Sequence, residues 1–318
     1  MLTATWGLRA GVGILFWALL AGCGTPDETP EDPGPFSEEL APHRNAGAST
    51  AGDPLARESR ARPELRICAD PNNLPFSNEA GEGFENRIAE LVAEELGAVP
   101  TYTWWAQRRG FIRNTLRAGH CDLVLGLPSG YELALLTRPY YRSTYVFVHP
   151  PDREFLVESL DDPRLGDLLI GIHISGDDYQ NPPGSQALAT RGYVDNVRGY
   201  SIYGNYSEPN PPARIFDALD AGEIDIAIVW GPLAGFFSGL RERPFDLVPV
   251  TPQVDLPFLP FVFDISMGVR RGDDRLRDEL DAILVDRRPE IEAILGSYGV
   301  PMVERPGASA SGVRGVGS

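Results

Sequence analysis

The stretch Leu116-Arg117-Ala118-Gly119-His120-Cys121-Asp122-Leu123-Val124-Leu125-Gly126 decides the fold class of this chain. It ends a helical pattern on Ala-Gly and then enters a buried strand through an aspartate. Further along, Leu219-Asp220-Ala221-Gly222-Glu223-Ile224-Asp225-Ile226-Ala227-Ile228 repeats that arrangement. One helix-Gly-x-x-Asp-strand unit in each half is what two related lobes would contain. Common helix-stop chemistry, which produces such a likeness by chance, is the alternative.

The sequence on either side of these two stretches alternates strand patterns with helix patterns. Predicted strands lie at 65–69, 102–105, 122–127, 145–148, 168–172, 224–229, 246–250 and 264–269, and predicted helices at 84–96, 108–118, 213–221, 273–285 and 289–297. Helices that connect parallel strands cover both faces of a sheet. The alternation therefore predicts an α/β protein with mostly parallel sheets flanked by helices.

Residues 1–22 have the layout of a secretory signal peptide. Arg9 precedes the apolar run Val12–Leu20, and small residues follow it. The run is too short to span a bilayer, which needs roughly 20 apolar residues. Leu20-Ala21-Gly22-Cys23 fits a bacterial lipobox, so we expect Cys23 to carry a lipid anchor. An ordinary signal peptide followed by an incidental cysteine is the alternative.

Low-complexity segments flank the part of the chain that is expected to fold. Residues 23–63 are rich in Pro, Gly, Ser, Ala, Asp and Glu, and such a composition buries too little apolar surface to order a chain. We expect this segment to be a flexible tether behind the lipid anchor. Residues 304–318 are expected to form a flexible tail. Roughly 240 residues remain between, enough for one large or two modest domains.

The charge of the chain excludes several function classes. Its net charge is −17 and its isoelectric point is near 4.7. Nucleic-acid binding needs a basic surface that neutralises phosphates, so no nucleic-acid partner is expected. Every basic residue is an arginine. The absence of lysine excludes Schiff-base enzymes, Ser-Lys dyads and phosphate-binding loops that depend on lysine.

Two cysteines remain once Cys23 is assigned to the anchor. Cys68 and Cys121 each lie at or near the start of a predicted strand. An even count in an oxidising compartment favours a disulfide between them, with two free buried thiols as the alternative. The four histidines do not have zinc-ligand spacing with this pair, so no metal site is expected.

Three segments of the chain resemble the first lobe of periplasmic solute-binding proteins of type II, in which the chain crosses twice between two lobes. They are 65–97, Ala118-Gly119-His120-Cys121-Asp122 and Pro139-Tyr140-Tyr141. This resemblance implies that lobe one comprises residues 64–149 and 258–303 and that lobe two comprises residues 150–257. The ligand cleft and the hinge would then lie where the chain crosses between the lobes.

A second series of strings narrows the resemblance to the J proteins of methanol oxidation systems (MoxJ and XoxJ), which are solute-binding proteins associated with quinoprotein dehydrogenases. The strings are Cys68-Ala69-Asp70-Pro71-Asn72-Asn73-Leu74-Pro75-Phe76-Ser77-Asn78, Gly83-Phe84-Glu85-Asn86, 102–111, Arg113-Asn114-Thr115-Leu116 and 137–145. Each is weak alone, but together and in order they are specific.

This resemblance implies a periplasmic accessory protein that assists or docks to a PQQ-dependent methanol dehydrogenase, and that also works with its c-type cytochrome. It implies no cofactor for this chain, because the PQQ and a calcium or lanthanide ion belong to the dehydrogenase. The alternative is a solute-binding lipoprotein that delivers a small ligand other than an amino acid to an ABC transporter.

The resemblance also indicates what the cleft does not bind. Amino-acid-binding relatives hold the ligand carboxylate with an arginine after the second strand of lobe one, and the ammonium with an aspartate in lobe two. Here Tyr131-Glu132-Leu133 and Trp230-Gly231-Pro232 stand at those places. Asp177-Asp178 follows the expected anion loop and would repel a carboxylate. An ordinary amino acid is therefore not the expected ligand.

Candidate functional residues follow by analogy with the lobe edges of these relatives. The cleft candidates are Asn73, Phe76, Tyr131, Glu132, Arg138, His173 and Trp230. Trp230 would equally serve as an aromatic plug in an empty cleft. The candidates for a partner surface are Arg108, Arg109, Tyr203 and Tyr206. For these, a solvated helix face and ordinary loop packing are the alternatives.

Catalytic chemistry is not expected of this chain. The sequence offers no nucleophile with an adjacent base, and its histidines have no evident catalytic partner. The enzyme alternative depends on a carboxylate such as Glu132 acting as a base in a dry cleft.

Overall fold

The computed structural model describes residues 63–174, 182–202 and 209–304. The predicted signal peptide, the lipidated Cys23, nearly all of the tether, the loop residues Tyr203 and Tyr206, and all of the tail except its first residue lie outside these ranges. Within them, no helix combines the length and the apolar character that a membrane span requires.

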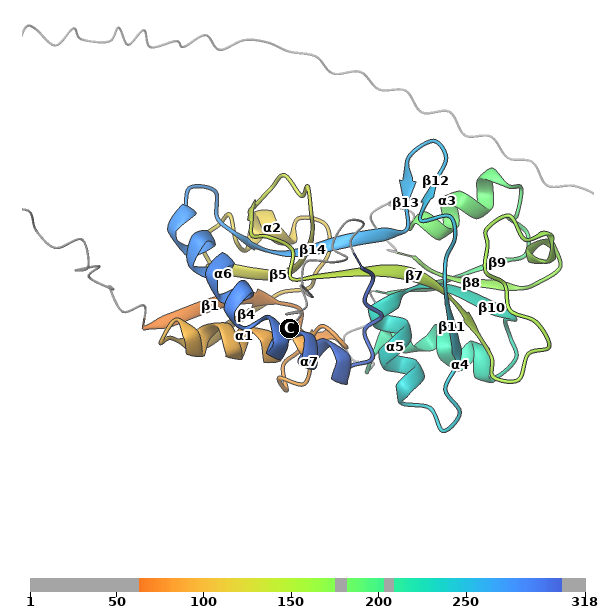
Figure 1. The fold of residues 1–318 in the computed structure, drawn as a ribbon, viewed down its shortest axis with the longest axis horizontal. Helices are drawn as coiled ribbons and strands as arrows, with labels where there is room; N and C mark the ends of the chain where they lie inside the picture. Colours follow the sequence, from red (N-terminus) through yellow and green to blue (C-terminus); the bar gives the residue numbers. More distant parts are fainter. Residues whose placement is uncertain (1–62, 175–181, 203–208, 305–318) are drawn as a thin grey trace, which may run out of the picture. The chain divides into compact units, whose positions relative to one another are not determined.

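Lobe one is built on a mixed sheet in which three parallel strands lie beside an antiparallel return strand (Figure 1). The order of these strands is β4 (Val99–Trp104), β1 (Glu64–Ala69), β5 (Leu123–Pro128) and β14 (Val262–Val269), with the short β6 (Leu135–Leu136) paired to β14. β2 (Asn72–Asn73) and β3 (Ser77–Asn78) form a small separate hairpin.

The helices of lobe one cover the sheet because strands and helices each have an apolar face to bury. α1 (Phe84–Glu95), α6 (Asp274–Asp286) and α7 (Arg288–Ser297) pack on one face, around Ile67, Ile88 and Leu280. α2 (Phe111–Asn114) and the chain around it pack on the other face.

Lobe two repeats the plan of three parallel strands beside antiparallel ones. Its strands, in order, are β9 (Val197–Ser201), β8 (Ile170–Ile174), β10 (Ile226–Trp230) and β7 (Tyr141–His149), and β11 (Asp246–Pro249) also pairs with β7. α4 (Arg214–Asp220) and α5 (Gly231–Gly239) pack on one face, and α3 (Pro183–Thr190) on the other. Short 3-10 turns occur at Pro163–Gly166 and Pro211–Ala213.

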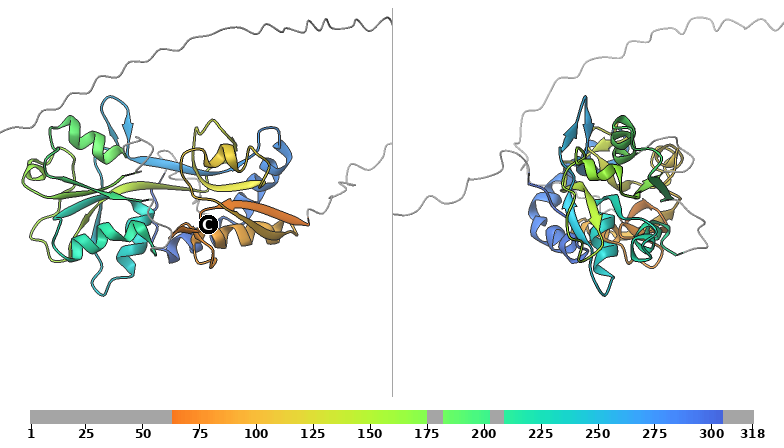
Figure 2. Two further views of the ribbon diagram at one scale, coloured as in Figure 1. Left: turned by 180° about the vertical axis from the view of Figure 1, so that it is seen from behind. Right: turned by 90° about the vertical axis from the view of Figure 1, so that its right-hand side faces the viewer.

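Two long strands carry the chain between the lobes. β7 and β14 pair with each other through Thr144 and Val262 at one end and Tyr141 and Ile265 at the other. Beyond this shared segment, β7 joins the lobe-two sheet and β14 joins the lobe-one sheet. Figure 2 shows the pair from behind, and the hairpin of β12 (Val254–Asp255) and β13 (Leu259–Pro260) projecting beside it.

The predicted α/β class with two lobes and two crossovers is confirmed, and several local predictions need correction. The helix predicted at 108–118 is only the single turn of α2. Gly110 enters it with φ +88°, and the backbone of Thr115 leaves helical geometry while its hydroxyl bonds the Phe111 carbonyl. A helix that was not predicted, α5, begins at Gly231-Pro232, directly after β10. Proline suits the first turn of a helix because no hydrogen bond is required of its nitrogen there.

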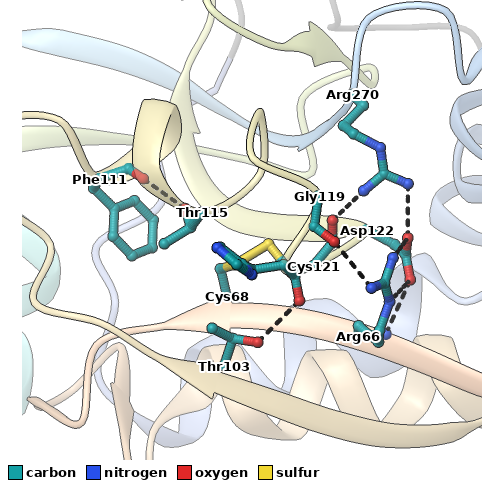
Figure 3. The surroundings of a disulfide bond; sticks show 10 residues. Arg66, Cys68, Thr103, Phe111, Thr115, Gly119, Cys121, Asp122 and Arg270 are labelled. Carbon is teal, nitrogen blue, oxygen red and sulfur yellow. Dashed lines mark hydrogen bonds and ion pairs between the residues drawn. A yellow bond between two sulfur atoms is a disulfide. The ribbon is translucent and has the colours of Figure 1, made fainter.

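The disulfide between Cys68 and Cys121 is present and joins β1 to the residues just before β5 (Figure 3). Beside the disulfide, two arginines pair with Asp122. The Nη2 atom of Arg66 lies 2.7 Å from Asp122 Oδ1, and that of Arg270 lies 2.8 Å from the same oxygen. Burial of Asp122 acts in the opposite direction, but these two guanidinium groups lower the pKa of its carboxyl to about 2. The aspartate of the first duplicated stretch therefore fixes the entry to β5.

Candidate functional site

A pocket of about 310 Å³ lies where the two crossover strands meet the lobes. Both lobes and both crossover strands contribute to its lining, which consists of Asn73, Phe76, Glu85, Gln107, Gly126, Pro128, Tyr141, Tyr145, Ile202, Trp230, Leu233, Phe263 and Ile265. Most of these side chains are apolar or aromatic. A concave apolar pocket with few polar groups is the usual form of a small-molecule site.

Three aromatic rings in mutual contact form one wall of the pocket. The ring centroids of Tyr145 and Trp230 are 5.3 Å apart, those of Trp230 and Phe263 are 5.8 Å apart, and those of Tyr145 and Phe263 are 6.2 Å apart. Tyr145 comes from β7, Phe263 from β14 and Trp230 from the end of β10. The two contacts of Phe263 are edge-to-face and the contact between Tyr145 and Trp230 is tilted, arrangements that aromatic pairs favour at these separations.

Within the part of the lining that the structure describes, the one acidic residue is Glu85, in the first turn of α1. Its residue surface is 8 % exposed, and burial raises the pKa of its carboxyl to about 8. The carboxyl group lies directly over the backbone of β5, since a Cβ atom on Gly126 would stand 2.3 Å from Glu85 Oε1. Gly126 has φ +76°, a conformation in which only glycine is unstrained. The left-handed backbone conformation of Gly126 and its missing side chain together leave the space that Glu85 occupies.

The chain before α1 satisfies the first backbone N–H groups of that helix. Phe84 N donates to the Pro75 carbonyl at 2.8 Å and Glu85 N donates to the Phe76 carbonyl at 2.9 Å. This contact requires glycine at 83, where a Cβ atom would stand 2.0 Å from the Phe76 oxygen. These two N–H groups are consequently not available to an anion, although helix N-termini often serve that purpose.

A polar network holds the rim of the pocket in lobe one. Asp70 Oδ2 accepts a hydrogen bond from the Gln107 backbone N–H at 2.6 Å, and its Oδ1 accepts one from the Asn72 N–H at 2.9 Å. Asn73 Nδ2 donates to Gln107 Oε1 at 3.1 Å. Asn73 and Gln107 are therefore positioned by each other and by the turn after β1.

The structure brings three of the predicted cleft residues to the pocket and places the other four elsewhere. Asn73, Phe76 and Trp230 belong to the lining. Tyr131 packs against the cluster beside the disulfide, because the turn at 129–131 carries it to that face of the sheet. Glu132, on the same connection, has a backbone carbonyl that accepts a hydrogen bond from Arg271.

Arg138 and His173 have partners of their own outside the pocket. Arg138 is exposed, and its Nε lies 3.8 Å from Asp281 Oδ1 on α6. His173 is buried beneath α4, with Nε2 3.1 Å from the Pro212 carbonyl and its ring near Phe216. Burial lowers the pKa of His173 to about 4, against the effect of that hydrogen bond, so the ring is neutral at pH 7. Both side chains serve local packing or pairing.

Ten of the thirteen described lining residues were not predicted as cleft residues, among them Glu85 and the two crossover aromatics, Tyr145 and Phe263. A signal for Glu85 existed. It precedes Ala89 and Val92 by four and seven residues, and both of those are fully buried. Helical spacing therefore places the acid on the buried face of α1. No comparable signal marks the aromatics, because a buried strand residue has the same pattern whether it faces core or pocket.

The candidates for a partner surface are only partly described. Arg108 and Arg109 are exposed on the connection that precedes α2. Within the described ranges, no three His, Cys, Asp or Glu side chains gather as the ligands of a metal ion would.

The lobed sheets, the two paired crossover strands and the pocket at their junction define the class of this chain: it is a type II periplasmic binding protein. The crystal structure of the periplasmic binding protein XoxJ from Methylobacterium extorquens AM1 is 36% identical and superposes with a TM-score of 0.62, covering 76% of this chain and all of that one. The structure of MxaJ from Methlophaga aminisulfidivorans MPT, 24% identical, shares the fold with a TM-score of 0.64 over 75% of this chain and all of that one.

The chain belongs to the MoxJ family. Protein MoxJ of Methylorubrum extorquens AM1 is 32% identical over 254 residues, which cover 75% of this chain and 81% of that protein. A scan of protein-family models finds none that matches. The J-protein resemblance expected from the sequence strings is thereby confirmed.

Proposed function

We propose that this protein is a periplasmic accessory of a methanol oxidation system that docks to a PQQ-dependent methanol dehydrogenase and has no catalytic step of its own. Membership of the MoxJ family supports the association with methanol oxidation. In this proposal the PQQ, its calcium or lanthanide ion and the cytochrome c belong to the partner system. The accessory supplies a binding surface.

The observation that carries the docking proposal is the tip of the β12–β13 hairpin. Leu256 is 83 % exposed and Phe258 is 88 % exposed, and they flank Pro257. Adjacent large apolar side chains in water are unusual on a protein that acts alone, and they often mark a contact with another protein. Aromatic residues are also enriched at the centres of such interfaces.

The hairpin is held in place from its base, so the exposed tip is a preformed feature. Asp255 accepts two hydrogen bonds from Arg191, at 2.7 Å from Nη1 and 2.8 Å from Nη2. This bidentate pair joins β12 to the end of α3. On the other side of the tip, Phe261 is fully buried in lobe two. A fixed tip binds with little loss of conformational entropy.

A lipid anchor completes the proposal. A lipidated Cys23 and the acidic tether after it would keep the protein at the periplasmic face of a membrane while it reaches the dehydrogenase. The Cys23→Ser variant should move from the membrane fraction to the soluble periplasmic fraction on centrifugation. If the variant remains in the membrane fraction, the anchor is contradicted. The docking proposal is not affected by this outcome, because it is tested separately.

The docking test compares two surface variants of the tagged full chain. Leu256→Ser with Phe258→Ser removes the apolar tip, and Leu240→Ser removes an apolar side chain that is 64 % exposed at the end of α5. Capture from the periplasm should recover the dehydrogenase large subunit with the unchanged chain and with Leu240→Ser. Direct binding to the purified dehydrogenase should weaken about thirtyfold or more for the tip variant, as for the loss of an interface hot spot.

Two outcomes would contradict the proposal. One is equal affinity of the tip variant and the unchanged chain for the dehydrogenase. The other is recovery of transporter permease components alone, which would favour the second candidate function, a solute-binding lipoprotein of an ABC transporter for a small ligand other than an amino acid. The pocket of about 310 Å³ is the observation in favour of that second function.

A further inference from the structure

We propose that the pocket binds a small alkylammonium cation, with the Glu85 carboxylate as its counter-ion and the rings of Tyr145, Trp230 and Phe263 around its alkyl groups. This inference concerns the pocket at the crossover strands and is independent of the hairpin through which the chain is proposed to dock. It assigns a ligand class to a cleft from which the amino-acid-binding groups are missing.

The charge of the lining selects a cation. Among the described residues of the pocket, Glu85 is the only one with a carboxyl, guanidinium or imidazole group, so it is the only one that a cationic ligand could pair with. The nearest arginine along the crossover strands is Arg142, which follows the lining residue Tyr141 and therefore points to the other side of β7. Its Nη1 lies 2.8 Å from Asp264 Oδ2, and this ion pair offers no charge to a ligand in the pocket.

The Glu85 carboxyl group is also in need of a partner. The residue is 8 % exposed, and no hydrogen bond or ion pair to its carboxyl oxygens occurs among the described residues. A buried carboxylate without a partner is unfavourable, and its neutral form loses the hydrogen bonds that water would make. A ligand that brings a positive charge next to Oε1 and Oε2 removes this cost. The same argument excludes a carboxylate ligand. Its negative charge would lie next to that of Glu85, and no arginine is among the described lining residues to neutralise it.

The aromatic rings suit an alkylammonium ion better than a bare metal ion. A cation over an aromatic face is attracted by the electrons of the ring, and cages of several rings recognise methylated ammonium groups. A divalent metal ion would need several oxygen ligands, whereas Glu85 is the only carboxylate among the described residues of the lining. The pocket volume of about 310 Å³ has room for an ion of the size of choline.

The ionisable groups around Glu85 do not compete for its charge. They are three tyrosines, Tyr102 on β4, Tyr140 just before β7 and Tyr141 on it. Burial raises the pKa of each phenol, and the Glu85 carboxylate raises it further. All three are therefore neutral over the range in which Glu85 titrates, and among the described lining residues only Glu85 contributes charge to the pocket.

The experiment is isothermal titration calorimetry of the purified full chain at pH 8 with choline chloride and with 3,3-dimethyl-1-butanol. The alcohol replaces the quaternary nitrogen of choline by carbon, so it keeps the shape and lacks the charge. We expect one choline per chain and affinity for the alcohol at least tenfold weaker. Glu85→Gln should lose at least tenfold of the choline affinity, while Glu94→Gln, on the exposed side of the same helix, should lose none.

A further variant distinguishes the effect of the negative charge on ligand binding from an effect of the substitution on folding. Glu85→Asp keeps the negative charge on a shorter side chain, so it should retain a preference for choline over the alcohol even if its affinity falls. Near-ultraviolet circular dichroism, which reports on the packing of the aromatic wall, verifies that each variant is folded. The proposal is overturned if choline fails to bind the unchanged chain in the millimolar range, if the alcohol binds as tightly, or if Glu85→Gln binds choline as well as the unchanged chain does.

Discussion

Replacing Glu85 by glutamine should remove a pH dependence from the stability of this protein. Burial raises the pKa of this carboxyl to about 8 in the folded chain, whereas its ordinary value is 4.5. Between these two values the folded protein holds a proton that the unfolded chain releases. The free energy of unfolding therefore falls as pH rises. The contribution is fully present below pH 4.5 and is lost as the pH rises through about 8.

The magnitude follows from the separation of the two pKa values. Each pH unit between them is worth about 1.4 kcal/mol, so the whole contribution is about 5 kcal/mol. Over the experimentally convenient interval from about pH 5 to about pH 8, the unchanged chain should lose about 3.5 kcal/mol relative to Glu85→Gln. This is less than the full contribution because the unfolded carboxyl is already mostly ionised at about pH 5 and the folded one is only half ionised at about pH 8. The amide has its own burial cost, but that cost is independent of pH.

Urea unfolding followed by tryptophan fluorescence measures this difference, with the disulfide left intact. Unfolding free energies of the two proteins are compared at each pH, so that every other titrating group cancels. Glu94→Gln removes an exposed carboxyl from the same helix and should give a curve parallel to that of the unchanged chain. If the curve of Glu85→Gln is also parallel between pH 5 and pH 8, Glu85 does not hold its proton in the folded state and the reasoning fails.

Two further predictions concern the frame of the pocket. Gly126→Ala should destabilise the protein by about 2–4 kcal/mol, because alanine is strained at this positive φ and its Cβ atom would also contact Glu85 Oε1. The control is Gly97→Ala, which is also at positive φ but has open space around it, and it should destabilise the protein by only about 1 kcal/mol. Chemical unfolding measures both losses. Equal losses would show that the contact with Glu85 is not tight. Replacing Cys68 and Cys121 together by serine opens a loop of sequence separation 53 and should lower the unfolding free energy by about 4 kcal/mol, and a loss below about 1 kcal/mol would contradict the loop argument.

The elements that the sequence predicted best are those whose pattern is local. The buried strand at Glu64–Ala69 and the helix at Phe84–Glu95 follow from hydrophobic spacing and from a glycine stop at Gly97. The short α2 was predicted too long because hydrophobic spacing does not reveal where a helix ends. Here it ends at Thr115, whose hydroxyl donates a hydrogen bond to the Phe111 carbonyl. The start of α5 was missed because Gly-Pro is as common in turns as in the first turn of a helix.

The pairing of Cys68 with Cys121 was suggested by the sequence but decided by the tertiary structure. Their even count and oxidising address suggested a bond, and free thiols remained an alternative. Only the placement of β5 beside β1, with Ile67 opposite Leu123, brings the two residues to a Cα separation of 5.5 Å. Neighbouring strands in a parallel sheet are joined by long connections, so no local pattern contains that distance.

By itself, the sequence determined the class of fold and indicated two lobes, because both depend on residue types and on short-range spacing. The expectation that the cleft does not hold an amino acid came from the resemblance to solute-binding proteins. Only the tertiary structure decided which side chains form the pocket. Glu85 occupies the space left by the missing side chain of Gly126, and Tyr145 and Phe263 pack against Trp230. The partners in each contact are far apart in the sequence. A pocket is a property of surfaces that face one another, and which surfaces do so is decided when the sheets assemble.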